Sequence, residues 1–422
     1  MESQSTVKGQ RYPLSDMQRV HFLMCNLLPH QPVGNLPILF RLHDSVDMHR
    51  LARAIEQAVK AHDAFATTID AGWMGWAGRT GRILAALTDT TRQRVAATFD
   101  YQLTVEAVSD LEMQRNMDGA LVVPFKTTNS PLFRIRLFQT PTARYLFADV
   151  HHAICDGASM PVVIEDIERA YHGQPIESED YNITDAVLRV RTLQSGEAGA
   201  RANQWYREKL KGMPHGILPR PDHPGGAGII RQVVCPLGLS LDHLQQLASN
   251  LGGTVNVVTT AAFAILLSQY SGSRQIPLLL AYSARDDQHI ARTVGMISRG
   301  IVLNTTVENN TLTKDFVTTI KFYMLRGMRN CYYKTSQLMK TDMKWHTAMP
   351  FLYHGETTMT PVIGGAPAQR IMLPIRIKGG MPMAVHCMII DGEAHLMVFY
   401  RDDLYSEQYV RQMVADYAKL LY

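Results

Sequence analysis

Residues 145–160, which read YLFADVHHAICDGASM, limit the possible folds of this chain more than any other stretch. The stretch begins with an apolar run typical of a buried strand and ends in a turn that opens a helix. Read as a strand, its even-numbered residues, ending in His152, share one face, and its odd-numbered residues, ending in His151, share the other. The two adjacent histidines therefore point in opposite directions, and only one of them faces a given cavity.

His152 is the better candidate for a catalytic group. It ends the face made of small and aliphatic residues and lies four positions before Asp156. An imidazole with an ordinary pKa of about 6.5 accepts a proton at neutral pH when a neighbour fixes its tautomer. Gly157 predicts a sharp backbone path where the strand gives way to the helix. A structural histidine at a strand end is the alternative, but two histidines followed by Asp-Gly favour a catalytic loop, which commonly follows a strand.

His151, His152, Asp156 and Gly157 together resemble the HHxxxDG signature of the condensation domains of nonribosomal peptide synthetases. Those domains belong to the superfamily of chloramphenicol-acetyltransferase-like acyltransferases. Further segments resemble other parts of the family in the expected order: residues 12–18 (YPLSDMQ), 62–67 (HDAFAT), 203–210 (NQWYREKL) and 294–305 (VGMISRGIVLNT). The resemblance covers nearly the whole chain.

The chain departs from the family in its second motif, RHExLRT. Ala66 stands where the family commonly has an arginine that pairs with the aspartate of the central motif. The usual ion-pair partner of Asp156 is therefore missing at this position. Arg285 matches an arginine that often follows the strand in this region, so it is predicted to pair with Asp156 and hold the motif turn in shape.

The resemblance implies an α/β (α+β) fold with two chloramphenicol-acetyltransferase-like lobes in a V and a tunnel between them. A chain of 422 residues suits two domains of about 200 residues each. The polar segment 172–181, HGQPIESEDY, is the best candidate boundary. We therefore expect residues 1–177 to form an N-terminal lobe that carries the signature and residues 178–422 to form a C-terminal lobe.

Local patterns predict the main elements. Apolar periodicity predicts helices from Asp16, capped by Ser15, and over residues 46–62, 158–171, 182–210 with a break near Gly196, 240–251, 256–270, 313–330 and 406–421. Strands are predicted over residues 38–42, 132–139, 144–150, 229–236 and 276–282, with closing strands within 373–401. Residues 72–89, rich in Gly, Trp and small side chains, predict a loop.

The resemblance also assigns roles to residues. His152 would position or deprotonate an acceptor, His151, Asp156 and Arg285 would be structural, and Gly157 would place a backbone N–H near a developing oxyanion. Two further residues are possible parts of the substrate tunnel: Ser298 and Asn304. No covalent enzyme intermediate, metal or cofactor bound by the enzyme itself is expected.

Two neighbouring side chains remain open to interpretation. Arg299 contacts an anionic group or is simply a surface charge. Cys155 lies inside the motif, but it has no dedicated base, so we interpret it as a wall residue rather than a nucleophile.

The function implied is a condensation-type acyltransferase of nonribosomal peptide or related secondary metabolism, such as antibiotic biosynthesis. Its donor would be a thioester on the phosphopantetheine arm of an acyl or peptidyl carrier protein, and its acceptor a small-molecule amine or alcohol. One alternative is a coenzyme A-dependent O- or N-acyltransferase, although the DFGWG motif of plant-type members is absent. An epimerising relative and a non-catalytic recruitment module are the others, and the intact histidines argue against the last. The start at Met1 favours a free-standing enzyme over an excised domain.

Composition excludes several other classes. With 46% hydrophobic residues, 19% charged residues and a net charge of +4, the chain is typical of a globular protein, and no basic stripe predicts a nucleic-acid partner. The first ten residues lack the pattern of a signal peptide, and the longest apolar segment, 257–267, is too short to span a membrane. Five scattered cysteines without CxxC spacing indicate reduced thiols, no zinc site and a cytoplasmic location.

Overall fold

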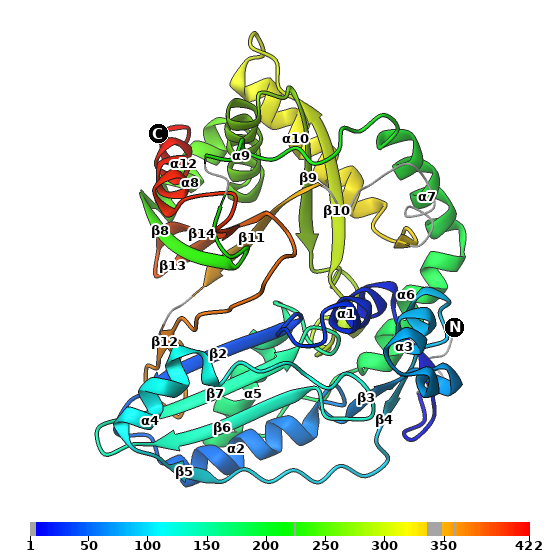
Figure 1. The fold of residues 1–422 in the computed structure, drawn as a ribbon, viewed down its shortest axis with the longest axis vertical. Helices are drawn as coiled ribbons and strands as arrows, with labels where there is room; N and C mark the ends of the chain where they lie inside the picture. The colour runs from blue at the N-terminus through cyan, green and yellow to red at the C-terminus, as the bar shows by residue number, and fades with distance from the viewer. Residues whose placement is uncertain (1–5, 223–224, 336–347, 358–359) are drawn as a thin grey trace. The chain divides into compact units, whose positions relative to one another are not determined.

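The computed structural model describes residues 6–222, 225–335, 348–357 and 360–422 (Figure 1). Contacts divide the chain into two compact units. The first comprises Met1–Thr192, Ser283–Ser298 and Met359–Ile375, and the second comprises Leu193–Tyr282, Arg299–Thr358 and Arg376–Tyr422. This division differs from the boundary expected at residue 177, because two segments from late in the chain return to the first unit. The composition of segment 172–181 predicts where a local boundary lies. It does not predict that segments from later in the chain join the first unit.

The first unit is built on a five-stranded sheet. Its strands lie in the order β12 (Gln369–Ile371), β2 (Asn35–Leu42), β7 (Arg144–His151), β6 (Phe133–Gln139) and β5 (Val105–Ala107). Strands β6 and β7 pair antiparallel, which confirms the predicted strand pair. Helices α2 (Met48–Ala61) and α5 (Ser159–Tyr171) pack together over one face, and α4 (Asp110–Arg115), continued by a π-helical turn over Asn116–Ala120, contributes to the other (Figure 1).

Strand β7 alternates as its sequence predicts. Leu146 and Val150 belong to the core that includes α2 and α5, whereas Tyr145 and Phe147 belong to the core on the opposite face with Met113 of α4. Both faces are therefore apolar, which is why the strand reads as a nearly continuous hydrophobic run. This double burial fixes the register of β7 and so the place where the histidines leave the sheet.

Helix α1 (Asp16–Leu27) begins at Ser15, as predicted. The Ser15 hydroxyl accepts a hydrogen bond from the Gln18 backbone N–H at 3.1 Å, and the Gln18 side chain accepts one from the Ser15 backbone N–H at 2.9 Å. This reciprocal capping box defines the helix start locally. A small sheet, in the order β1 (Tyr12–Pro13), β4 (Arg92–Val95) and β3 (Thr67–Asp70), completes the surroundings of the helix.

The loop predicted over residues 72–89 is wrong. The segment forms a 3₁₀ helix, η1 (Gly72–Ala77), and the helix α3 (Gly78–Leu87). At Gly81 an added Cβ would lie 1.8 Å from the Met74 carbonyl oxygen. The small residues that suggested a loop therefore allow these two helical pieces to touch.

The second unit is built on a six-stranded sheet. Its order is β10 (Arg299–Thr306), β9 (Gln275–Tyr282), β11 (Met349–Thr357), β13 (Met383–Ile390), β14 (Glu393–Arg401) and β8 (Ile230–Ser240). Its core includes side chains of α8 (Leu241–Asn250), α9 (Val255–Ser271), α10 (Thr313–Arg329) and α12 (Glu407–Lys419). The predicted break near Gly196 is confirmed, since α6 (Ile183–Ser195) ends and α7 (Glu197–Lys209) begins there.

A membrane-spanning helix must meet two conditions, a sufficient length and a sufficiently apolar composition. Within the described ranges no single helix meets both, and α8 and α9 meet them only as a pair that is bent by 83°.

Candidate active site

The candidate site lies where β7 ends and the chain turns into α5. Strand pairing stops at His151, opposite Asn35, and the His152 backbone N–H donates to the Gly34 carbonyl oxygen at 2.7 Å. The Ile154 N–H donates to the His151 carbonyl oxygen at 2.9 Å and closes the turn. His152 is thus the first residue beyond the strand, so the turn, and not strand alternation, decides where its side chain points.

His152 is held in one tautomer. Its Nδ1 lies 2.9 Å from the Cys155 carbonyl oxygen. Because a carbonyl oxygen only accepts, Nδ1 carries the proton and Nε2 carries the lone pair. Burial lowers the pKa of His152, and the nearby Asp156 charge offsets part of that effect. The ring is therefore neutral at pH 7, with an unprotonated Nε2 that has no hydrogen-bond partner among the described residues.

His151 has the opposite tautomer and no free nitrogen. Its Nδ1 accepts a hydrogen bond from the Ala153 backbone N–H at 3.0 Å, so its proton is on Nε2, which lies 3.0 Å from the Cys25 sulfur. The Cys25 thiol in turn donates to the Val33 carbonyl oxygen at 2.8 Å. The side chain is fully buried, and burial lowers its pKa to about 3. This geometry supports the structural role expected for His151.

His21, which the sequence analysis missed, lies flat against His152. The two ring centroids are 4.2 Å apart and the ring planes differ by 17°. Burial lowers the pKa of His21 well below its ordinary value, and the neighbouring His152 and His151 lower it further. A signal was present in the sequence, because His21 follows Gln18 by three positions and so shares its face of α1. The Gln18 amide donates to the Ala153 carbonyl oxygen at 2.9 Å, which directs that face toward the motif turn.

Asp156 is enclosed by donors. Its Oδ1 accepts from the Ser159 backbone N–H at 3.1 Å and the Ser159 hydroxyl at 2.8 Å, and its Oδ2 accepts from the Ile297 and Ser298 backbone N–H groups at 3.1 and 2.9 Å. The predicted ion pair with Arg285 is present and bidentate, at 2.9 Å for both contacts. Burial alone would raise the pKa of Asp156, but Arg285 and the hydrogen bonds from Ser298 outweigh it and lower the pKa. The carboxylate therefore stays charged and accepts no proton from a reactant.

Arg285 compensates for the departure in the second motif. Ala66, where the family has an arginine, is buried in the core of the first unit. The cation beside Asp156 comes instead from the returning segment Ser283–Ser298. The Arg285 guanidinium also donates to the Thr293 carbonyl oxygen at 3.0 Å, so it braces its own segment as well as the turn.

The two possible tunnel residues lie in different surroundings. The Ser298 hydroxyl donates to Asp156 Oδ2 at 2.7 Å and so belongs to the donors around that carboxylate. Asn304 lies in β10 of the second unit, and its Oδ1 is buried without a hydrogen-bond partner in the described part of the chain. Their roles as tunnel residues stay a prediction. Arg299, in contrast, is not a surface charge: it is 3% exposed and donates to the Cys331 and Tyr333 carbonyl oxygens at 3.1 and 2.8 Å.

The sequence predicts that glycine stands at position 157 because the backbone turns sharply there. That prediction is wrong, since the backbone conformation at this position does not require glycine. Its φ lies outside the left-handed region, and a Cβ added there would have no neighbour within 4 Å. The residue is exposed, so the space that a side chain would fill is open to an approaching molecule. Cys155 beside it is fully buried, and burial raises its pKa to about 12, which matches a wall residue.

Comparison with protein families identifies the chain. The model of the family described as condensation domain matches residues 8–421. The chain belongs to the condensation-domain family. It is 27% identical over 345 residues to tyrocidine synthase 3 of Brevibacillus parabrevis and 26% identical over 320 residues to surfactin synthase subunit 1 of Bacillus subtilis (strain 168). These alignments cover 78% and 74% of this chain but only 5% and 8% of the two relatives, so the chain spans a small part of their length.

Solved structures agree on the fold of this condensation domain. The condensation domain of the monacolin K polyketide synthase MokA superposes with a TM-score of 0.80 at 15% identity, covering 99% of this chain and 97% of that one. The epimerization domain from the third module of tyrocidine synthetase B superposes with a TM-score of 0.77 at 16% identity, covering 100% and 97%. Because domains titled for condensation and for epimerization share this fold, the fold alone does not name the reaction.

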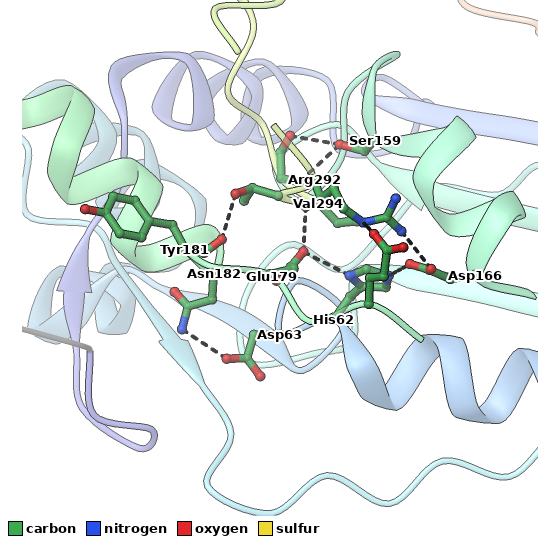
Figure 2. A network of polar contacts seen from close by, with 12 residues as sticks. His62, Asp63, Ser159, Asp166, Glu179, Tyr181, Asn182, Arg292 and Val294 are labelled. Atoms are coloured by element: carbon green, nitrogen blue, oxygen red, sulfur yellow. Dashed lines mark hydrogen bonds and ion pairs between the residues drawn. The ribbon is translucent and has the colours of Figure 1, made fainter. Parts of the chain in front are cut away.

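A second polar network anchors the returning segment Ser283–Ser298 in the first unit (Figure 2). The two ring nitrogens of His62 lie 3.0 Å from Asp166 and 2.9 Å from Glu179, so both donate to carboxylates. Arg292 contacts the other Asp166 oxygen at 2.8 Å, and the Val294 N–H donates to Glu179 at 2.6 Å. Burial would lower the pKa of His62, but hydrogen bonds to Asp166 and Glu179 raise it to about 9. At neutral pH His62 is a buried imidazolium that joins α2, α5 and the returning segment of the condensation domain.

Across the described part of the chain, no three His, Cys, Asp or Glu side chains gather in a group that could hold a metal ion.

Proposed function

We propose that this condensation domain is an acyltransferase that joins a thioester-bound acyl or aminoacyl donor to an amine or alcohol acceptor. The observation that carries the proposal is the state of His152. The ring is neutral, its Nδ1–H is held by the Cys155 carbonyl oxygen, and none of the described residues occupies its Nε2 lone pair. A neutral imidazole of this kind is suited to accept or orient the proton of an attacking nucleophile.

In the proposed reaction, Nε2 of His152 receives the proton of the acceptor as its nitrogen or oxygen attacks the thioester carbonyl carbon. The new C–N or C–O bond forms, the C–S bond breaks, and the leaving thiolate takes the proton back from the imidazolium. The positive charge that develops on His152 faces the permanent charge of Asp156, which raises the basicity of the ring without accepting its proton. No covalent enzyme intermediate is required.

Gly157 supplies the second part of the proposal. The tetrahedral intermediate carries negative charge on the former carbonyl oxygen, and a backbone N–H close to that position would stabilise it. Gly157 is exposed, and no described atom lies within 4 Å of the place where its Cβ would be. That open space supports a close approach of the substrate to the backbone.

The proposed donor is carried on the phosphopantetheine arm of an acyl or peptidyl carrier protein, and the acceptor is a small-molecule amine or alcohol. Support comes from the synthetase relatives, which are named for tyrocidine and surfactin. We place the reaction in nonribosomal peptide or related natural-product biosynthesis, with coenzyme A as the alternative carrier of the donor. All five cysteines lie in the described ranges and none forms a disulfide, which supports a reducing compartment such as the cytoplasm.

The test compares wild type with His152→Ala in a product assay read by mass spectrometry. Carrier-protein and coenzyme A thioesters are each offered with a panel of amines and alcohols. We expect product from wild type and a loss of about a hundredfold or more in His152→Ala, the size typical of general acid–base groups. His49→Ala, which changes an exposed histidine on α2, serves as the matched control and should keep full activity.

The outcomes separate the alternatives. The preferred donor decides between carrier-protein and coenzyme A dependence. Equal activity in a folded His152→Ala variant overturns the mechanism. An epimerised donor without a condensed product would favour the epimerising class, and no reaction with any donor would favour a recruitment module.

A further inference from the structure

Helix α1 brings a second imidazole to the proposed base. His21 and His152 are stacked with 4.2 Å between ring centroids and 17° between ring planes. Both side chains are partly exposed, so the stack lies at the edge of the core and not inside it. The two rings meet face to face, so their contact is not a hydrogen bond.

We propose that His21 is a positioning residue for His152, whose ring plane it fixes so that the free Nε2 lone pair keeps one direction. The inference rests on the proposed function of His152 as the base. It adds a residue of α1, outside the HHxxxDG signature, to the machinery of the site.

The need for such a residue follows from the hydrogen bonding of His152. One contact, from Nδ1–H to the Cys155 carbonyl oxygen at 2.9 Å, is the ring's only hydrogen bond to the described residues. A single hydrogen bond holds one atom but leaves the ring free to tilt about that contact. A flat partner against the ring face opposes that tilt.

Helix α1, which carries His21, is held in place by several hydrogen bonds. Its first turn is closed by the capping box of Ser15 and Gln18, and the Gln18 amide donates to the Ala153 carbonyl oxygen at 2.9 Å and to the Gln93 side-chain oxygen at 3.0 Å. His21 lies one turn further on the same face. The helix is thus tied to the motif turn beside His152, and the stack inherits that alignment.

The charged and titratable groups around the stack leave His21 neutral. His151 is neutral because burial lowers its pKa to about 3, and burial raises the pKa of Cys25 and Cys155 to about 12, so their thiols stay protonated. Asp156 is charged and paired with Arg285. Burial lowers the pKa of both His21 and His152, and the neighbouring His152 and His151 lower that of His21 as well.

The experiment uses two replacements that separate ring stacking from imidazole chemistry. His21→Phe keeps a flat ring against His152 and removes both nitrogens, whereas His21→Ala removes the ring and admits water. Two quantities are measured in each full-length variant: the pH profile of kcat and the pKa of His152 from ¹⁵N-histidine NMR. The NMR titration needs no substrate, so it reports on the stack whether or not the enzyme turns over.

We expect His21→Ala to lower kcat about tenfold, because a misplaced base loses rate more than binding. Water beside the ring should also raise the pKa of His152 toward about 6.5 and move the acid limb of the profile up with it. His21→Phe should keep both the rate and the acid limb close to wild type. A His21→Ala variant with unchanged kcat and pKa overturns the inference, and so does a His21→Phe variant as impaired as His21→Ala, since the nitrogens of His21 would then act directly.

Failure of the inference and failure of the proposed function give different results. If His152→Ala is inactive while His21→Ala is unchanged, only the positioning role fails. If His152→Ala keeps full activity, the proposed function fails, whatever the titration of His152 shows. Thermal melting of each variant confirms that the comparison is between folded proteins.

Discussion

The motif turn has two sides with opposite polar chemistry. On the buried side, both nitrogens of His151 and both oxygens of Asp156 have partners, and neither side chain is more than 1% exposed. On the open side, Gly157 is exposed and His152 is partly exposed, and Nε2 of His152 has no hydrogen-bond partner among the described residues.

The difference explains why His151 and His152, which are adjacent and have the same side chain, have different roles. A saturated polar group cannot exchange protons with a reactant, but it holds the turn, because leaving a buried charge unpaired is costly. An unsaturated group at the rim contributes little to folding and is available for chemistry. The following predictions test whether the two sides separate in this way.

The largest expected effect is on the buried side. Asp156→Ala leaves the Arg285 guanidinium, which is 8% exposed, without its carboxylate. Breaking one partner of a buried pair typically costs about 3–5 kcal/mol in free energy of unfolding. Arg285→Ala should cost a similar amount, and the double variant less than the sum, because the two changes remove one interaction. Urea denaturation followed by circular dichroism measures all three.

A surface pair provides the control for that cycle. Glu407 and Arg411 are both more than half exposed on α12, and Glu407→Ala should cost at most about 1 kcal/mol. Additive losses at Asp156 and Arg285 would contradict the pairing.

The next effect concerns the network around His62 and depends on pH. The pKa of His62 is about 9 in the folded protein and about 6.5 when unfolded, so folding binds a proton there. The stabilisation is complete below pH 6.5 and is lost as the pH rises through 9, and its size is on the order of 3 kcal/mol. His62→Gln should remove this slope in the free energy of unfolding measured from pH 6 to about pH 9.5. An unchanged slope in His62→Gln, with His49→Gln as the matched control, would assign the titration to another group.

Gly157→Ala tests the open side. The methyl group meets no atom and the backbone is not strained, so the free energy of unfolding should change by less than about 1 kcal/mol. Activity should nevertheless fall about tenfold or more, because the methyl group occupies space that the substrate needs to reach the backbone N–H. A fully active Gly157→Ala variant would remove this N–H from the proposed mechanism.

The smallest effect is expected at Cys155. Burial raises the pKa of its thiol to about 12, so no thiolate is present at neutral pH. Cys155→Ala should therefore keep activity within about twofold, as for a residue without a nucleophilic role. Loss of activity comparable to that of His152→Ala, in a variant that melts normally, would instead indicate covalent catalysis.

Local patterns predicted most elements but failed where a contact crosses the chain. The alternation in β7 and the cap at Ser15 follow from neighbours a few residues away, and both are confirmed. The loop expected over residues 72–89 is instead helical, because Gly81 serves the approach of η1 to α3 and not a turn. In the sequence, a glycine required by a turn cannot be distinguished from a glycine required by a close contact between helices.

The candidate site divides along the same line. The spacing of the motif residues identifies them, and only the family resemblance predicts Arg285 as the partner of Asp156. His21 was missed because it lies in helix α1, far from His152 in the sequence, and only the fold brings the two rings together. A surface position was one of the two alternatives for Arg299, and it is wrong. The environment of Arg299 is set by carbonyl groups of residues far along the chain.

By itself the sequence determined which side chains stand at the motif turn, and where the strand and helices beside it begin, because capping, alternation and helical spacing act over a few residues. Only the tertiary structure decided their states. The returning segment keeps Asp156 charged, burial keeps both motif histidines neutral, and α1 supplies the ring against His152. Ionisation and orientation depend on desolvation and on charges brought from distant parts of the chain, and these exist only once the chain has folded.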